Sequence, residues 1–140
     1  MSMHVEQAAK TVVMVGATQP DPQLKKQMET RGITVCWART IEEVTDLLKP
    51  ALGRTIVITE PALKDGNWRD LLERIRRTSI PVVLKTSSST AELWWDALEC
   101  GIEDILVAPF STPRLGEYLE KHFATQEPRE QEERDASEQE

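Results

Sequence analysis

Five short apolar runs recur along the chain, and many of their residues are β-branched. They do not alternate with polar residues, which is typical of strands that are buried on both faces of a parallel sheet. Each run is also shorter than an ordinary helix. The pattern therefore predicts five strands, over residues 11–15, 33–37, 55–59, 80–84 and 102–107.

A segment with apolar residues at helical spacing follows each run. Asp21 and Pro22 predict the capped start of the first helix, and Thr40 precedes Glu43 by the spacing of a capping box. Gly101 predicts the end of the fourth helix. The helices are expected over about residues 23–30, 41–48, 68–75, 91–100 and 112–123.

Strands and helices thus alternate along the chain and are joined by short links. This order predicts an α/β fold in which a five-stranded parallel sheet carries helices on both faces. We expect residues 11–123 to form one domain, after an N-terminal extension over residues 1–10. Residues 124–140 are expected to be an acidic, disordered tail, because they have almost no apolar side chains.

The formal net charge of −7 is concentrated in this tail, where residues 125–140 hold seven acidic residues and two arginines. The remainder of the chain is nearly neutral and has no basic stripe, so we expect no binding to nucleic acid. No apolar run approaches the length that spans a bilayer, and the N-terminus lacks the apolar region of a secretory signal. We therefore expect a cytoplasmic protein that does not bind membranes.

Several segments share their order and spacing with a known family. Residues 80–86 read IPVVLKT, residues 97–104 read ALECGIED, and residues 108–110 read APF. Together with residues 32–35 (GITV) and 40–44 (TIEEV), they resemble the receiver domains of bacterial response regulators, the CheY-like superfamily. The resemblance implies a flavodoxin-like (βα)5 doubly wound sandwich with strand order 2-1-3-4-5.

Receivers accept a phosphoryl group on an aspartate at the end of the third strand, and an acidic pair after the first strand helps to hold Mg²⁺. Carried over to this sequence, the resemblance places Glu60 at the phosphoacceptor position and Gly16 and Ala17 at the acidic pair. Ala108 stands where receivers have a lysine, and Thr86 keeps the switch hydroxyl. The resemblance therefore implies a degenerate pseudo-receiver with no metal, cofactor or catalytic residue, in which Glu60 is not expected to be phosphorylated.

Glu60 and Lys85 each leave two interpretations open. The Glu60 carboxylate either imitates the charge of a phosphoryl group or is a solvated loop residue. Lys85 either replaces the lysine that is missing at Ala108 or extends to the edge of the sheet. The alternation of side chains along a strand favours the second interpretation, because Lys85 and Thr86 should point to opposite faces.

We expect a stand-alone pseudo-receiver in two-component or phosphorelay signalling that is not an enzyme and acts by protein–protein contact. Its partner is expected to be a histidine kinase, a regulator or an output protein, or a second copy in a homodimer. One alternative is a receiver that accepts phosphate on a non-standard acid, for which Asp65 is the nearest candidate. The others are a structural scaffold and, least favoured, a flavin- or nucleotide-binding protein, because the first loop lacks a glycine-rich phosphate cradle.

The contact surface is expected on the fourth helix, fifth strand and fifth helix, where receivers typically dimerise or dock. Trp94 is expected to pack inward and the adjacent Trp95 to be exposed, because neighbouring residues on a helix point about 100° apart. An exposed tryptophan is a frequent interface anchor. The candidate interface residues are Trp95, Ile105, Leu115 and Tyr118, and Ile105 also stands at the family's aromatic switch position.

Overall fold

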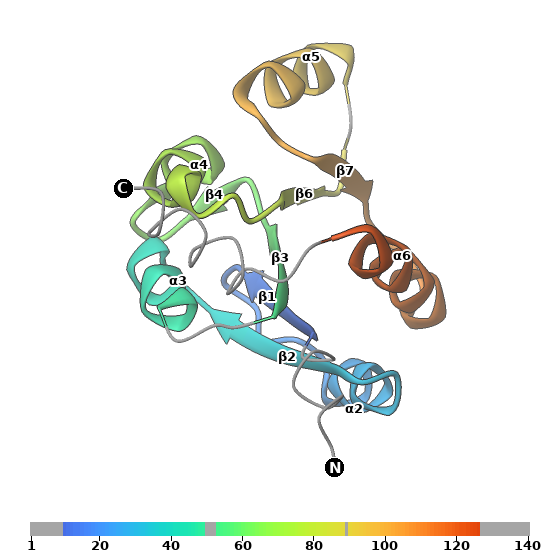
Figure 1. The fold of residues 1–140 in the computed structure, drawn as a ribbon. Helices are drawn as coiled ribbons and strands as arrows, with labels where there is room; N and C mark the ends of the chain where they lie inside the picture. Colours follow the sequence, from blue (N-terminus) through green and yellow to red (C-terminus); the bar gives the residue numbers. More distant parts are fainter. Residues whose placement is uncertain (1–9, 50–52, 89, 127–140) are drawn as a thin grey trace.

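Five parallel strands form the centre of the molecule (Figure 1). The computed structural model describes residues 10–49, 53–88 and 90–126. The strand order is β2-β1-β3-β6-β7, which is 2-1-3-4-5 when these five strands are counted along the chain, so the predicted α/β, flavodoxin-like fold is confirmed. The strands are β1 (Lys10–Val15), β2 (Ile33–Ala38), β3 (Arg54–Thr59), β6 (Val82–Thr86) and β7 (Asp104–Val107).

Helices cover both faces of the sheet (Figure 1). Side chains of α2 and α6 pack on one face, and those of α3, α4 and α5 pack on the other. A 3₁₀ turn, η1 (Arg76–Thr78), follows α4, and the loop after β3 contains a small ladder of β4 (Ala62–Leu63) and β5 (Gly66–Asn67). The helices are α2 (Pro22–Thr30), α3 (Ile41–Leu48), α4 (Trp68–Ile75), α5 (Ala91–Cys100) and α6 (Thr112–Thr125). Within the described residues, none of them has the length and apolarity needed to cross a bilayer.

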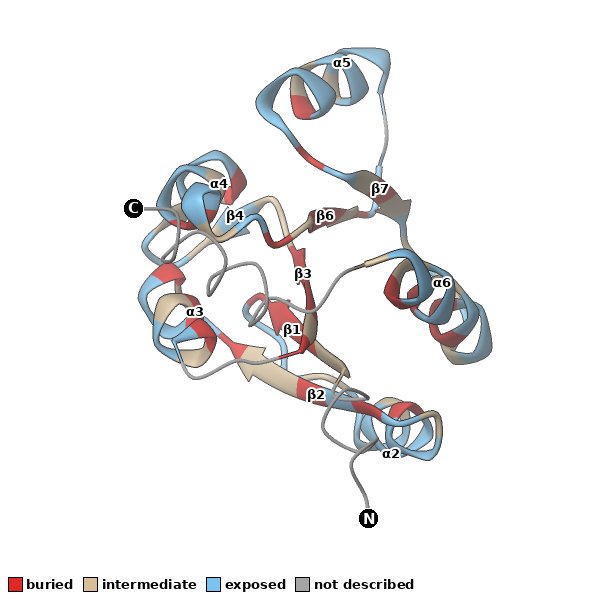
Figure 2. Cartoon of the chain, viewed as in Figure 1, coloured by how far each residue is buried: buried red, intermediate tan, exposed pale blue. Residues whose placement is uncertain are grey.

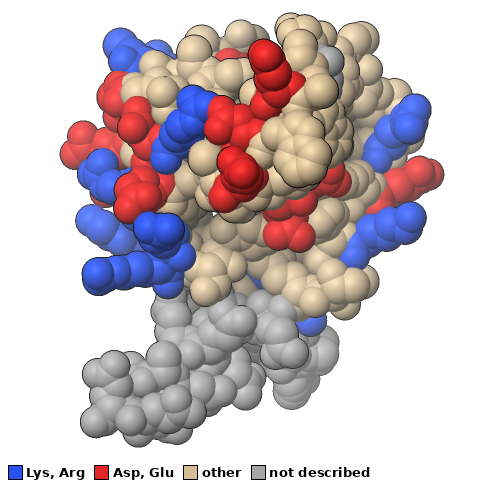
Figure 3. All heavy atoms as spheres, turned by 90° about the horizontal axis from the view of Figure 1, so that it is seen from above, with Lys and Arg blue, Asp and Glu red and all other residues tan. Residues whose placement is uncertain are grey.

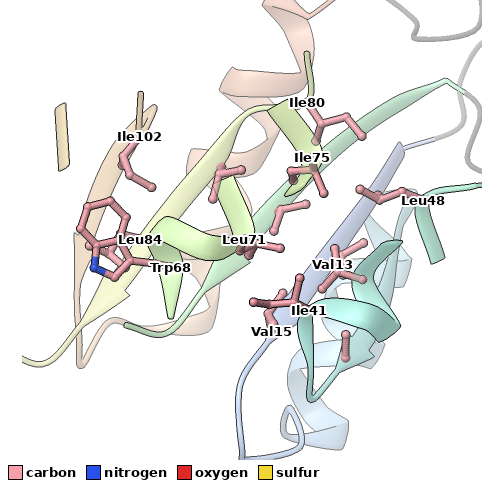
Figure 4. Packing of buried hydrophobic residues seen from close by; sticks show 14 of the residues in the cluster. Val13, Val15, Ile41, Leu48, Trp68, Leu71, Ile75, Ile80, Leu84 and Ile102 are labelled. Carbon is pink, nitrogen blue, oxygen red and sulfur yellow. The ribbon is translucent and has the colours of Figure 1, made fainter. Parts of the chain in front are cut away.

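The central strands are buried on both faces (Figure 2). On β1, Val13 and Val15 face the cluster under α3, α4 and α5, whereas Val12 and Met14 face the cluster under α2 and α6. Figure 4 shows the first cluster, in which side chains of α3 and α4 pack against the sheet. Burial from both sides explains why the apolar runs in the sequence do not alternate with polar residues.

The predicted helix ends are confirmed at three places. The Asp21 side chain accepts a hydrogen bond of 2.8 Å from the Gln23 N–H and caps α2. The Thr40 hydroxyl accepts one of 3.1 Å from the Glu43 N–H and caps α3. Gly101 ends α5 with a φ of 106°, a left-handed conformation that glycine adopts without steric cost.

Three predicted elements have boundaries that are wrong by two residues. The fifth strand begins at Asp104 rather than at residue 102. The fourth strand covers Val82–Thr86 rather than residues 80–84, because Pro81 has no N–H to donate to a ladder. The domain also extends beyond Phe123, since α6 continues to Thr125.

Gln126 explains why the domain boundary lies later than predicted. Its side-chain amide donates a 2.8 Å hydrogen bond to the carbonyl of Thr55, and its own carbonyl accepts one of 2.7 Å from Arg54 Nε. Residues 124–126 are therefore part of the folded domain and not of the tail. The rest of the predicted tail, and nearly all of the predicted N-terminal extension, lie outside the described residues.

Candidate functional site

The receiver-like positions predicted from the sequence meet at the carboxyl edge of the sheet. Gly16 follows β1, Glu60 follows β3, Thr86 ends β6 and Ala108 follows β7. Parallel strands all end at the same edge, so loops that are far apart in sequence become neighbours there. Glu60 and Ala108 line one cavity of about 350 Å³, here called the edge cavity, together with Thr86, Lys85, Pro61, Ala62 and Ser87.

The Glu60 carboxylate lies over the backbone of the loop after β1. Its Oε1 accepts a hydrogen bond of 3.3 Å from the Ala17 N–H, and the Glu60 N–H donates one of 3.0 Å to the Val15 carbonyl. A Cβ atom at Gly16 would overlap the Glu60 carboxylate. The carboxylate therefore occupies the space that any side chain at Gly16 would need, so the two residues are sterically coupled.

Lys85 faces Glu60 at the carboxyl edge of the sheet, a contact that neither interpretation of Lys85 included. Its Nζ lies 3.8 Å from Glu60 Oε2, and the two side chains are 31% and 28% exposed. The distance exceeds that of a hydrogen bond, and a partly exposed ion pair of this kind contributes little to stability.

The strand register explains the position of Lys85. Val15 pairs with Thr59, and Thr59 pairs with Leu84. The residues that follow Val15, Thr59 and Leu84 are Gly16, Glu60 and Lys85, respectively. These three occupy equivalent positions on neighbouring parts of the sheet, so the Glu60 and Lys85 side chains point to the same face. The prediction compared Lys85 only with its chain neighbour Thr86 and did not use the register across the sheet.

Thr86 is buried, and its hydroxyl forms hydrogen bonds with the backbone of the loop that follows β6. The hydroxyl donates a 2.8 Å hydrogen bond to the Ser88 carbonyl and accepts one of 3.3 Å from the Ser88 N–H. Ala108 contributes a backbone N–H, which donates to the Thr86 carbonyl at 2.8 Å, and no polar side chain. Across residues 10–49, 53–88 and 90–126, no group of three or more His, Cys, Asp or Glu side chains could hold a metal ion.

Asp65, the alternative candidate for accepting phosphate, forms hydrogen bonds with another element of the fold. Its carboxylate accepts hydrogen bonds from the Ile41 N–H at 2.9 and 3.1 Å and from the Glu42 N–H at 3.3 Å, so it caps α3 from a different loop. The Ile41 N–H is the main cause of a lowered pKa at Asp65. Asp65 thus has a structural role, and Glu60 is the acid that lines the edge cavity.

We expect Asp65→Ala to lower the free energy of unfolding by about 1 kcal/mol at neutral pH, the usual cost of losing a helix cap. Because the folded-state pKa lies below the unfolded one, the carboxylate contributes stability above the unfolded pKa and loses it as the pH falls through the folded pKa. Urea denaturation at several pH values measures the difference in unfolding free energy between the wild type and Asp65→Ala. This difference should shrink below about pH 4. Lys64→Ala, at the exposed neighbouring residue, is the control and should change stability by much less; an equal loss would contradict the capping role.

The largest exposed apolar side chains of the described chain lie on α5 and β7. The exposed fractions are 71% for Trp95, 49% for Leu98, 46% for Val107 and 37% for Trp94, and these four residues are here called the α5 face. Figure 3 looks onto the side of the molecule where α5 lies and shows uncharged surface with acidic side chains gathered beside it. Exposed apolar patches with a polar border are typical of interaction sites.

The exposure of Trp94 contradicts the expectation that it packs inward. Leu93 and Ala97, four residues apart on α5, take the positions that face the core. Trp94 is one residue beyond Leu93, so it lies at the border of the buried stripe and is partly exposed. The α5 face therefore contains both adjacent tryptophans rather than Trp95 alone.

Two of the candidate interface residues are buried. Ile105 belongs to the core cluster under α3, α4 and α5, and Leu115 belongs to the cluster under α2 and α6. Leu115 begins a run continued by Leu119 and Phe123 at four-residue intervals, which is the buried stripe of α6. These two residues present no surface to a partner.

Tyr118 is half-buried and its hydroxyl is already paired. The hydroxyl donates a 3.0 Å hydrogen bond to Asp104 Oδ2, and the ring centroid lies 4.5 Å from that of His122. Burial, followed by the nearby Asp104 carboxylate, raises the pKa of Tyr118 well above its usual range. Of the four candidate interface residues, Trp95 is the one that the structure leaves largely exposed.

The comparisons with known proteins find one curated relative and many similar structures. No protein-family model matches the chain. The swarming motility regulation protein RssB of Serratia marcescens is 28% identical over 94 residues, which cover 66% of this chain and 42% of RssB. The chain thus spans less than half the length of this relative.

The similar structures are receiver domains and response regulators. The non-phosphorylated receiver domain of HemR from Leptospira biflexa has a TM-score of 0.67 at 25% identity, and the match covers 85% of this chain and 98% of that domain. A two-component response regulator from Clostridium difficile has a TM-score of 0.71 at 22% identity, covering 83% of this chain and 97% of the other. The fold of the whole described chain is therefore the one found in these proteins.

Proposed function

We propose that this chain, which has the fold of response-regulator receiver domains, is a pseudo-receiver that acts in two-component signalling by protein contact and without aspartyl phosphorylation. The observation that carries the proposal is the arrangement of Glu60, Gly16 and Lys85. A carboxylate fills the space over Gly16, where receivers need a metal-binding side chain, and a lysine lies beside it.

The chemistry of phosphoryl transfer to a carboxylate supports the absence of phosphorylation. A bound Mg²⁺ offsets the negative charge that develops when a phosphoryl group approaches a carboxylate. Mg²⁺ prefers oxygen ligands in an octahedral arrangement and is usually held by one or two carboxylates. Gly16 and Ala17 offer no side-chain oxygen, and the Glu60 carboxylate is engaged by the Ala17 N–H. Transfer would have to proceed without the metal that makes it feasible.

The Glu60–Lys85 contact supports a domain whose conformational state does not depend on phosphorylation. Glu60 brings a negative charge to the site, and Lys85 brings a positive charge from β6 instead of from the position of Ala108. The pair lies across β3 and β6, two central strands of the sheet. We therefore infer that the Glu60 carboxylate takes the place of a transferred phosphoryl group.

The α5 face supports a role in protein contact. Trp95 and Leu98 are exposed on one helix, and Val107 is an exposed apolar residue of the edge strand β7. The partner is a protein with an apolar contact surface, and self-association is the first case to test because it needs no other component. The name of RssB indicates a regulatory protein, which is consistent with this role.

The proposal predicts that Mg²⁺ with beryllofluoride, which imitates a phosphoryl group in shape and charge, does not bind the edge cavity. Amide NMR signals of Ala17, Glu60 and Thr86 should not move on titration of the nitrogen-15-labelled protein. Saturable shifts at these residues that require both reagents would contradict the proposal and favour a phosphate-accepting receiver.

A further inference from the structure

A second cavity lies next to the edge cavity, on the side of the sheet that carries α2 and α6. Its volume is about 610 Å³, within the range of small-molecule sites. Met14, Leu24, Ile58 and Phe110 give it an apolar lining. Its charged lining residues are Glu60, Asp21 and Lys85. This space is here called the α2 cavity.

The α2 cavity occupies the place where ligands bind in open α/β sheets. The connection from β1 to β2 runs through α2 on one face, and the connection from β2 to β3 runs through α3 on the other. The carboxyl ends of β1 and β3 therefore flank the point where the direction of winding reverses. Met14 of β1 and Ile58 of β3 both line the cavity, which places it at this switch point.

The walls of the α2 cavity are preorganised. Pro20 in the loop after β1 and Pro22 at the start of α2 both line the cavity and restrict the backbone there, and the Asp21 carboxylate is held as the cap of α2. Gly16 also lines the cavity, and its carbonyl accepts a 3.1 Å hydrogen bond from the indole N–H of Trp37. A preformed site of this kind loses little conformational entropy when a ligand binds.

The charged groups of the cavity define the chemistry of its ligand. The Lys85 ammonium and the Glu60 carboxylate are 3.8 Å apart, which is too far for a hydrogen bond and leaves their attraction incompletely satisfied. Within the described residues the Lys85 ammonium donates no hydrogen bond, so all three of its donors are available to a ligand. Glu60 Oε2 likewise accepts no hydrogen bond there, because the Ala17 N–H goes to Oε1.

Ligands with a single type of charge fit this site poorly. Two carboxylates, Glu60 and Asp21, and one ammonium line the cavity, so a phosphate ester or a nucleotide would meet net repulsion. An amine without a carboxylate would be attracted by the two carboxylates, but it would compete with Lys85 for Glu60 and leave the Lys85 ammonium without a counter-charge. A ligand with adjacent positive and negative groups satisfies Glu60 and Lys85 together, and its apolar part can cover Met14, Leu24 and Phe110.

We propose that the α2 cavity binds a free α-amino acid with a large apolar side chain, whose carboxylate pairs with Lys85 and whose ammonium pairs with Glu60. The inference rests on the proposed function, because a pocket that accepts phosphate would need Glu60 and Lys85 for that purpose. Binding separates Glu60 from Lys85 and so couples a small-molecule signal to the site where receivers carry a phosphoryl group.

The test is an NMR titration of the nitrogen-15-labelled protein with L-phenylalanine, in the absence of Mg²⁺ and phosphodonor. The signal of the Trp37 indole N–H, identified by its loss in Trp37→Phe, should shift saturably, because this group donates a hydrogen bond to Gly16, which lines the cavity. 3-Phenylpropionate, which lacks the ammonium, and phenethylamine, which lacks the carboxylate, should each bind at least about tenfold more weakly, since each leaves one charged group of the site unpaired.

Variants of the two charged residues complete the experiment. Lys85→Met and Glu60→Gln should each weaken L-phenylalanine binding about tenfold or more, whereas Lys64→Met, at an exposed lysine that does not line the cavity, should not. Equal binding of all three compounds, tighter binding of either analogue, or no saturable shift with L-phenylalanine would overturn the inference. Because Mg²⁺ and beryllofluoride are titrated separately, these outcomes are distinguishable from failure of the proposed function.

Discussion

Trp95→Ala is expected to weaken association through the α5 face by at least about tenfold, which corresponds to about 1.4 kcal/mol. The side chain is 71% exposed, so most of its area is available to a partner. Tryptophan is enriched among interface residues whose truncation costs about 2 kcal/mol or more. Trp94 and Leu98 are exposed apolar residues of the same helix, and Val107 is a further one on β7, so the partner can meet more apolar surface than that of Trp95 alone.

Sedimentation velocity over a concentration series measures this effect for self-association, and the same variant can be tested against a captured partner. Circular dichroism should show that Trp95→Ala remains folded, since the residue contributes little to the core. Trp37→Phe removes a tryptophan from the opposite edge strand β2 and should leave association unchanged. If the folded Trp95→Ala protein associates as strongly as the wild type, the α5 face is not the interface.

Gly16→Ala is expected to destabilise the protein by about 1 kcal/mol, the usual net contribution of one hydrogen bond, but only while Glu60 is present. The added Cβ overlaps the Glu60 carboxylate, which must leave its position over the loop. That movement breaks the 3.3 Å hydrogen bond from the Ala17 N–H and separates the carboxylate from Lys85. In a Glu60→Ala background the space is empty, so the same substitution should cost almost nothing.

Urea denaturation of the wild type, both single variants and the double variant gives the coupling energy, expected to be about 1 kcal/mol or more. Gly116→Ala is a matched control, because a Cβ there also meets a side chain, that of Arg31, but one distant from Glu60. Gly116→Ala and Glu60→Ala should therefore be additive within about 0.5 kcal/mol. A Gly16→Ala cost that is independent of Glu60 would show that the carboxylate does not occupy this space.

The fold could be predicted from the sequence because its signals are local. Non-alternating apolar runs mark strands buried on both faces, and Asp21, Thr40 and Gly101 mark helix ends by their own hydrogen bonds or backbone conformation. The end of the domain could not be predicted in this way. Gln126 is polar and follows no pattern, and its contacts with Arg54 and Thr55 join parts of the chain that are far apart in sequence.

The site could be predicted in outline for a different reason. Once a parallel sheet is expected, the residues that follow its strands must meet at one edge, so Glu60, Thr86 and Ala108 were placed together correctly. The orientation of Lys85 was missed because it depends on the register between β1, β3 and β6. That register follows from backbone pairing and not from the sequence of β6 itself.

The interface residues show where a resemblance alone is insufficient. The positions of Ile105 and Leu115 were taken from a family surface, although their spacing already indicates burial. Leu115, Leu119 and Phe123 repeat every four residues, and Ile105 stands in the middle of a strand. The exposure of Trp95 was predicted from helix geometry instead, and its side chain is exposed in the structure.

The central claim is that this receiver-like domain does not accept a phosphoryl group. The most direct measurement is intact-protein mass spectrometry after incubation with Mg²⁺ and a small phosphodonor, with Glu60→Asp treated in parallel. Neither protein should gain mass, because Gly16 and Ala17 leave the site without metal ligands even when the acceptor is shortened to aspartate. A gain of one phosphoryl group in the wild type that is lost on mild hydroxylamine treatment would contradict the claim.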